Sequence, residues 1–215
     1  MKTSYSELVQ NKLTSYVNYQ SLLGTIEWDE KRSEVLKRDD CKCKMCGKWE
    51  TVKQFMDGVG AYHCWFDDSS IDYFLGIEKK YKPSIIFGED ARIICYNGGM
   101  AEILADKPYH LEVHHKYYLR SSLPWQYKDD ALVTLCNWCH RGIHANGEPI
   151  PVYQNQSVRD FAVRYDANAS YGVSYYTPCS RCDGTGELPV YDHVQKGICF
   201  RCRGAGFDEL NNFKI

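Results

Sequence analysis

The chain has 215 residues, of which 44% are hydrophobic and 25% are charged, as in ordinary globular proteins. Its formal net charge of −2 excludes a globally basic nucleic-acid-binding protein, so any phosphate contact must come from a local patch. The sequence has no apolar run of about 18 to 20 residues, and residues 1–16 lack the apolar core of a signal peptide. It therefore predicts no membrane span and a cytoplasmic location.

The first predicted element is an amphipathic helix over residues 4–23, within an N-terminal segment of residues 1–27. Ser4 and Glu7 fit a capping box, apolar residues recur at helical spacing up to Leu22, and Gly24 follows as a stop. We expect this helix to pack on the core of the chain. The alternative is a helix that binds a protein partner.

Residues 28–38 predict a second helix, with Trp28, Val35 and Leu36 on one face. The stretch 31–53 is the most basic of the chain, with eight Lys or Arg residues against four acids. It is either a phosphate-binding surface or an ordinary solvated helix face.

Residues 48–108 predict an insertion of a few strands with a short helix around 99–105. Residues 110–119 predict a strand, 121–130 a loop, and 131–135 an extended approach to Cys136. A helix is expected from His140 to about Asn146. Residues 149–178 predict a connector with some strand.

The cysteines carry the strongest chemical signal. Eight of the 11 form four C-x-x-C pairs, at Cys43/Cys46, Cys136/Cys139, Cys179/Cys182 and Cys199/Cys202. Two thiolates at this spacing form half of a tetrahedral zinc site, so four pairs predict two structural zinc ions.

The tail, residues 179–206, repeats the pattern C-x-x-C-x-G-x-G, which favours a zinc site closed by its own two pairs. The pairs at 43/46 and 136/139 are then expected to close the other site. Closure of Cys43 and Cys46 with the tail remains an alternative.

The stretch "CNWCHRGIH" at 136–144 joins two half-sites. Cys139 and His140 are adjacent and leave the backbone in different directions, whereas His140 and His144 share one helix face. In "EVHHKYY", His114 and His115 point to opposite sides of a strand. One of these two can complete a three-histidine site with open positions, the pattern of a catalytic metal, and the other can act as a general base.

The stretches "WDEKRSEVLKRDDCKCKMCG" at 28–47 and "LEVHHKYYLRSSLPWQYKDDALVTLCNWCHRGIH" at 111–144 resemble the HNH (ββα-metal) endonucleases of the zinc-stapled C-x-x-C subgroup. The resemblance implies an α+β fold. Its ββα-metal core would span residues 28–148, with N-terminal helices, the 48–108 insertion, the 149–178 connector and a C-terminal zinc module at 179–215.

The resemblance also implies roles for single residues. His115 matches the general base, and His114, His140 and His144 match ligands of a catalytic divalent ion (Mg²⁺, Mn²⁺, Ni²⁺ or Zn²⁺). The family usually has an orienting Asn where this chain has Ala131, and the neighbouring Asp129 and Asp130 could substitute.

The expected function is hydrolysis of phosphodiester bonds in nucleic acid, with DNA as the expected substrate and a bacteriophage as a frequent source of such proteins. Lys116, Arg120 and Arg141 could hold the phosphate backbone, or could be ordinary surface charges. One alternative is a weakened HNH-like zinc protein that binds nucleic acid or protein.

The tail also resembles the cysteine-rich domain of J-domain co-chaperones. That resemblance implies zinc binding. The tail could be a structural staple, or a module that docks nucleic acid or a protein partner. A zinc-dependent chaperone adaptor is a third alternative.

Overall fold

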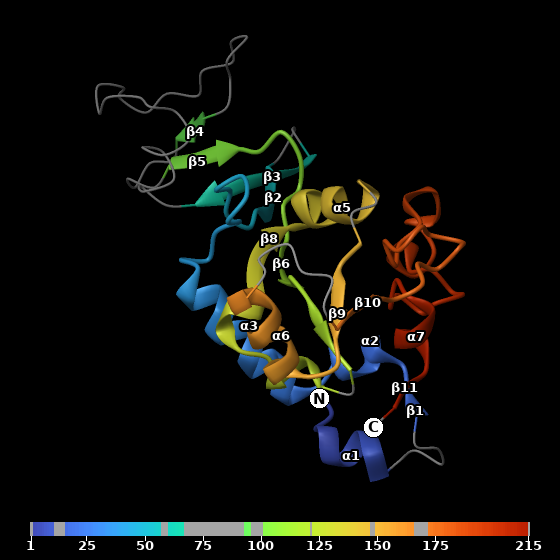
Figure 1. Cartoon of the computed structure of the whole chain (residues 1–215). Helices are drawn as coiled ribbons and strands as arrows, with labels where there is room; N and C mark the ends of the chain where they lie inside the picture. The colour runs from blue at the N-terminus through green and yellow to red at the C-terminus, as the bar shows by residue number, and fades with distance from the viewer. Residues whose placement is uncertain are drawn as a thin grey trace.

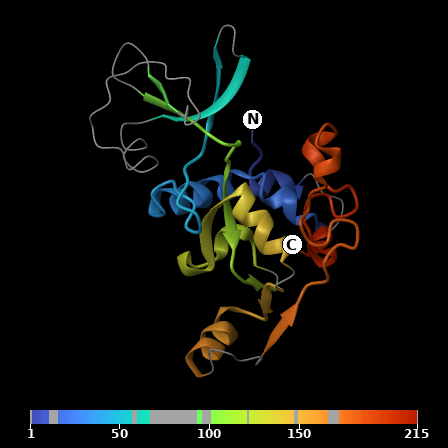
Figure 2. The ribbon, with the colours of Figure 1, turned by 90° about the horizontal axis from the view of Figure 1, so that it is seen from above.

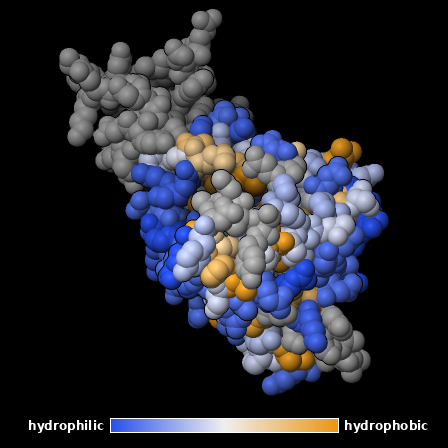
Figure 3. All heavy atoms as spheres, viewed as in Figure 1, coloured by the Kyte–Doolittle hydropathy of each residue, from blue (hydrophilic) through white to orange (hydrophobic). Residues whose placement is uncertain are grey.

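The computed structural model of the chain describes residues 2–10, 16–56, 60–66, 93–95, 101–120, 122–146, 149–165 and 172–214. These residues form a mixed α+β structure of short helices and small separate sheets (Figure 1). None of the helices in these ranges combines the length and apolar character needed to cross a bilayer. The face seen in Figure 3 is largely hydrophilic, with apolar groups in small patches.

The N-terminal segment forms two short helices and a strand, so the prediction of one helix over 4–23 is wrong. α1 is Tyr5–Gln10, β1 is Tyr16–Val17 and α2 is Tyr19–Leu22. The predicted capping box is present, because the Ser4 N–H donates to the Glu7 carboxylate and the Glu7 N–H donates to the Ser4 hydroxyl.

The predicted helix is interrupted because part of this segment pairs with a strand from the other end of the chain. β1 pairs antiparallel with β11 (Phe213–Lys214), which places Val17 opposite Phe213. Asn18 then begins α2, since its side-chain oxygen accepts from the Gln20 N–H while its amide donates to the Cys202 carbonyl. Tertiary contacts of this kind routinely override helix propensity.

The second predicted helix is confirmed as α3, Ile26–Arg38, which begins after an N-cap at Thr25. Trp28 and Val35 are buried on its inner face. This face packs against a hairpin made of β6 (Leu111–His115) and β8 (Leu132–Cys136). Leu111 lies opposite Cys136 and His115 opposite Leu132 in the hairpin.

The helix after β8 is α5, Asn137–Ala145, which begins three residues before the predicted start at His140. Cys136 caps it, because its sulfur accepts from the Cys139 N–H. Between β6 and β8 lie β7 (Tyr118–Leu119) and the short 3-10 helices η1 (Pro124–Gln126) and η2 (Asp129–Ala131). The strand predicted over 110–119 is therefore interrupted at 116–117.

The insertion contains strands, as predicted: β2 (Val52–Met56), β3 (Gly60–Phe66), β4 (Ile93–Cys95) and β5 (Ala101–Leu104). They pair in the order β2-β3-β5-β4. The short helix expected around 99–105 is wrong, because residues 101–104 form a strand between β3 and β4. The sheet projects on the side away from the C-terminal module (Figures 1 and 2).

The connector contains β9 (Pro151–Tyr153), β10 (Val173–Tyr175) and a helix that the sequence does not predict, α6 (Gln156–Tyr165). The strands form a sheet in the order β10-β9-β7. The tail continues through η3 (Pro189–Tyr191), η4 (Gln195–Gly197) and α7 (Asp208–Asn211).

One hydrophobic core joins the two ends of the chain. It combines residues of the N-terminal segment, the β7–β9 sheet and the tail, among them Leu22, Val152 and Leu210, each no more than 1% exposed. The tail module is thus held against the body through the N-terminal segment.

A buried carboxylate fastens the end of α3 to the hairpin. Asp39 is 4% exposed and accepts hydrogen bonds from the Arg38 guanidinium and from the Thr134 N–H of β8. Burial acts to raise the pKa of Asp39, but these hydrogen bonds outweigh it and leave the pKa lowered.

We expect Asp39→Asn to lower the free energy of unfolding by about 1–2 kcal/mol at pH 7, since it weakens two charge-assisted hydrogen bonds. Because the folded-state pKa is lowered, this contribution is present above the unfolded pKa of about 4 and is lost as the pH falls through the folded value. In urea unfolding, the difference in free energy of unfolding between the wild type and Asp39→Asn should stay constant from pH 7 to about 5 and shrink below about 4. The exposed neighbour, in Asp40→Asn, should change stability little; equal effects of both variants would contradict the proposed fastening.

Candidate metal centres

The first cysteine cluster joins two distant parts of the chain. Cys43 and Cys46 follow α3, whereas Cys136 and Cys139 lie where β8 enters α5, and their sulfur atoms lie within 4.8 Å of one another. The Cys46 and Cys136 sulfurs, from residues 90 positions apart, are 3.7 Å from each other.

Backbone donors point to two of these sulfurs, whereas burial raises the pKa of the Cys46 and Cys139 thiols. The Cys46 N–H points to the Cys43 sulfur and the Cys139 N–H to the Cys136 sulfur, each at 3.5 Å. Burial opposes ionisation of Cys43, but the backbone N–H groups around it lower its pKa to about 7. The cluster is compatible with a structural zinc ion.

The second cluster lies in the tail and is more deeply buried. Its members are all 5% exposed or less: Cys179, Cys182, Cys199 and Cys202. The Cys179 and Cys199 sulfurs are 3.9 Å apart, and those of Cys182 and Cys202 are 3.7 Å apart. The two cysteine clusters are thus compatible with two structural metal ions such as zinc.

The two tail repeats match each other in their contacts. The Cys179 N–H donates to the Gly206 carbonyl, and the Cys199 N–H donates to the Gly186 carbonyl. Gly186 and Gly206 have φ of +75° and +79°, and each donates its N–H to a cysteine sulfur at 3.3 Å. A Cβ at Gly186 would lie 2.5 Å from the Gly204 carbonyl oxygen, so only glycine fits.

Three histidines form a third cluster. His114 projects from β6, and His140 and His144 project from α5, with ligand nitrogens within 4.8 Å of one another. The Nε2 atoms of His140 and His144 are 3.2 Å apart. Three imidazoles that converge in this way could hold a divalent metal ion and leave coordination positions open.

The surroundings orient His140 and keep His114 and His144 in the ligating form. The Glu112 carboxylate lies 2.5 Å from His140 Nδ1, which directs the lone pair of Nε2 toward the cluster. Burial, followed by charge repulsion from His140, lowers the pKa of His114 to about 2 and that of His144 to about 4. Both rings are therefore neutral at physiological pH, as metal binding requires.

His115 does not join this cluster. Its ring is 4% exposed, stacks on Trp28 and Tyr118 with centroids 5.3 Å and 5.5 Å away, and meets Tyr127 edge-on. Burial lowers its pKa to about 4, although a hydrogen bond with the Pro124 carbonyl acts in the other direction. The role of His115 as general base stays a prediction that this enclosed position does not favour.

The residues at the position where the resemblance leads us to expect an Asn have other partners. Ala131 is completely buried, and its carbonyl accepts from the Lys116 N–H. Asp129 forms an ion pair with Lys31 and Asp130 with Arg159, and no hydrogen bond joins either carboxylate to His115 among the described residues. The polar contact described for the His115 ring is instead the Pro124 carbonyl.

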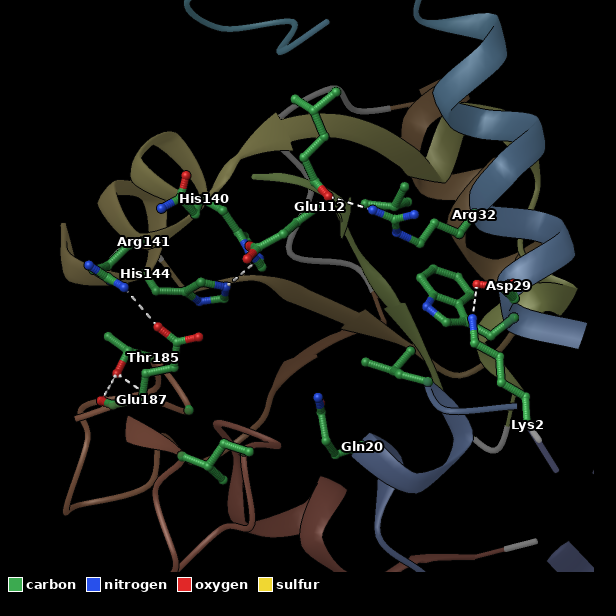
Figure 4. A pocket seen from close by; sticks show the side chains of 18 residues that line it. Lys2, Gln20, Asp29, Arg32, Glu112, His140, Arg141, His144, Thr185 and Glu187 are labelled. Atoms are coloured by element: carbon green, nitrogen blue, oxygen red, sulfur yellow. Dashed lines mark hydrogen bonds and ion pairs between the residues drawn. The ribbon is translucent and has the colours of Figure 1, made fainter. Parts of the chain in front are cut away.

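A cleft of about 470 Å³ lies beside the histidine cluster, with His140 and His144 in its lining. Glu112 of β6 and Arg32 of α3 also line it, and residues of the tail module form the facing wall (Figure 4). Arg141 reaches across from α5 to an ion pair with Glu187 at 2.9 Å. The tail module is therefore part of the cleft.

The three basic residues singled out in the sequence lie in different places. Arg141 lines the cleft, and Lys116 lines a second cavity together with His114. Arg120 instead hydrogen-bonds Ser174 in β10. The structure thus brings Lys116 and Arg141, but not Arg120, to the cavities around the histidines.

Two residues of the site, Glu112 and Arg32, are not predicted from the sequence. Glu112 precedes His114 by two positions on a strand, so strand alternation could have identified it as sharing the face of His114. Arg32 was only one member of the basic stretch 31–53. It donates to the Leu111 carbonyl, and no carboxylate within the described residues lies at ion-pair distance from it.

Comparisons of the chain with protein-family models, with curated proteins and with solved structures found no match.

We expect the purified protein to hold two zinc ions that resist dialysis and a third metal ion that exchanges. Elemental analysis should show one tight zinc fewer in Cys43→Ser and in Cys182→Ser. His140→Ala should lose the exchangeable ion alone. An unchanged zinc content in Cys43→Ser would contradict the pairing of Cys43 and Cys46 with Cys136 and Cys139.

Gly186→Ala should speed the transfer of zinc from the tail to a chelator, because it forces both a positive φ and a clash with Gly204. The backbone strain alone costs about 1–2 kcal/mol. Gly142→Ala is the matched control, since it lies in α5 with nothing within 4 Å of the added Cβ. Equal zinc release from both variants would show that the tail tolerates a side chain at Gly186.

Proposed function

We propose that this chain is a metal-dependent nuclease that hydrolyses phosphodiester bonds at the three-histidine cluster. The observation that carries the proposal is the convergence of His114, His140 and His144 beside a cleft that is lined by two of them and by arginines. The resemblance to HNH endonucleases adds the expectation of DNA as the substrate.

The donor set fits a divalent ion. Three imidazoles with open positions are typical of catalytic rather than structural sites, and Glu112 supplies the carboxylate partner that ligating histidines usually have. A divalent ion held there would act as a Lewis acid on the phosphate and favour the ionised form of water.

The residues of the cleft would then bind and orient the substrate. Arg32 keeps donors for a phosphate oxygen, because its described hydrogen bond goes only to a backbone carbonyl. Arg141 could exchange its ion pair with Glu187 for a phosphate. Such contacts are electrostatic, so binding should weaken as salt rises and depend little on sequence.

Two residues are candidates for the base that accepts the proton from water. His115 matches the family base, but aromatic rings enclose it in the present arrangement. Glu112 lines the cleft, yet its carboxylate already accepts a hydrogen bond from His140. We keep His115 as the proposed base and Glu112 as a positioning residue.

The second candidate is an HNH-like protein without hydrolytic activity, which uses its zinc sites as a binding or structural module. The enclosed ring of His115 and the alanine at 131 favour it. Both functions predict two zinc ions, so only a test of hydrolysis separates them.

The nuclease proposal predicts nicking of supercoiled plasmid in the presence of Mg²⁺, Mn²⁺, Ni²⁺ or Zn²⁺. His114→Ala and His140→Ala should abolish it, and Glu112→Gln should lower activity or metal affinity about 10- to 100-fold. His110→Ala is the matched control, since this exposed histidine lies only four residues before His114 but outside the cluster.

The outcome can go against the proposal. Wild-type nicking no faster than the His114→Ala background, with every metal, would leave the binding or structural module as the function. Full activity of His115→Ala would remove His115 as the base while the nuclease stands.

A further inference from the structure

A second cavity meets the histidine cluster through a different member. Its volume is about 490 Å³, and of the three histidines its lining includes only His114. The cleft described above is lined by His140 and His144. The cluster therefore lies between two hollows, and a ligand bound at the histidines could extend into both.

The two hollows differ in chemistry. The cleft carries arginines and carboxylates, among them Arg32, Glu112 and Glu187. The walls of the second cavity are mainly apolar, with Val133 and Leu135 from β8, Ile143 from α5, and Ile150.

The charged side chains that line the second cavity are basic, and one of them, Lys44, lies 3.9 Å from the Asp40 carboxylate outside the lining. Lys44 and Lys116 line it together with His114. Among the described residues of its lining there is no carboxylate. An apolar cavity with cations at its edge suits a flat apolar group attached to an anionic chain.

We propose that this cavity binds one unpaired base of the nucleic-acid substrate, next to the phosphodiester that is cut. The inference rests on the proposed function. Because His114 belongs to both the cluster and the cavity, a nucleotide whose phosphate lies at the histidines would place its base against the walls formed by Val133 and Ile143. Lys44 and Lys116 would then face the flanking phosphates.

The base must be unpaired to enter. A paired base is stacked on both faces within the duplex, so it can lie against the walls of this open cavity only after it leaves the helix. The apolar walls offer contact to the faces of any base and no pattern of donors and acceptors, which favours single strands of varied sequence. The substrate class is therefore single-stranded or locally unpaired DNA or RNA.

The test uses the full-length protein and single-stranded oligonucleotides of DNA and RNA that carry one abasic nucleotide at successive positions. Loss of the base should slow cleavage of the adjacent linkage about tenfold or more, and leave distant linkages unchanged. Single strands should be cut faster than the same sequences in a duplex.

A binding measurement tests the contribution of the base independently of cleavage. With only the two zinc ions bound, fluorescence anisotropy should show weaker binding of short oligonucleotides that contain only abasic nucleotides than of those with bases. Equal binding and equal cleavage with and without the base would overturn the proposal.

Val133→Phe should place an aromatic ring in the cavity where the base would lie, lower cleavage of the normal oligonucleotide, and reduce the further effect of the abasic nucleotide. Val52→Phe makes the same change at a strand residue that is 44% exposed and outside the cavity lining, and should behave as wild type. Zinc content and thermal unfolding check that both variants fold. If Val133→Phe does not fold, the abasic scan on the wild-type protein still decides.

The two proposals fail in different ways. If cleavage exceeds the His114→Ala background but has the same rate with and without the base, the cavity assignment is overturned and the nuclease proposal stands. Cleavage of no substrate above that background overturns both.

Discussion

The structure depends first on the convergence of the four sulfurs of Cys43, Cys46, Cys136 and Cys139. This contact joins the end of α3 to the junction of β8 and α5, although the residues lie about 90 positions apart in the chain. Because the Cys136 sulfur also caps α5, the same cluster determines where the helix begins. The start of the helix in turn determines where His140 and His144 project.

Further bonds reinforce this junction from both sides. Asp39 accepts from the Thr134 N–H, and the Lys44 N–H donates to the Thr134 carbonyl. The backbone of one strand residue therefore bonds both the end of α3 and the loop that carries Cys43 and Cys46. The Asn137 side chain accepts from the His110 N–H at the entrance to β6. The histidine cluster is thus built on elements whose ends are held, which limits how far its three rings can move apart.

Local spacing was enough to predict the parts of the site that lie close in sequence. The C-x-x-C pairs, the i,i+4 histidines and the alternation of His114 and His115 each follow from the geometry of a single element. The enclosure of His115 could not be predicted, because Trp28 and Tyr127 come from other elements and reach it only in the folded chain. The same reason explains the broken N-terminal helix, whose partner lies at Phe213.

The pairing of β1 with β11 gives the protein an order of assembly during synthesis. The last histidine of the cluster is already present when the ribosome has added residue 144. The wall that carries Glu187 is held against the body by contacts of residues 207–213 with the N-terminal segment. A growing chain therefore contains all three histidines of the cluster well before it contains residues 207–213, which hold the tail wall of the cleft in place.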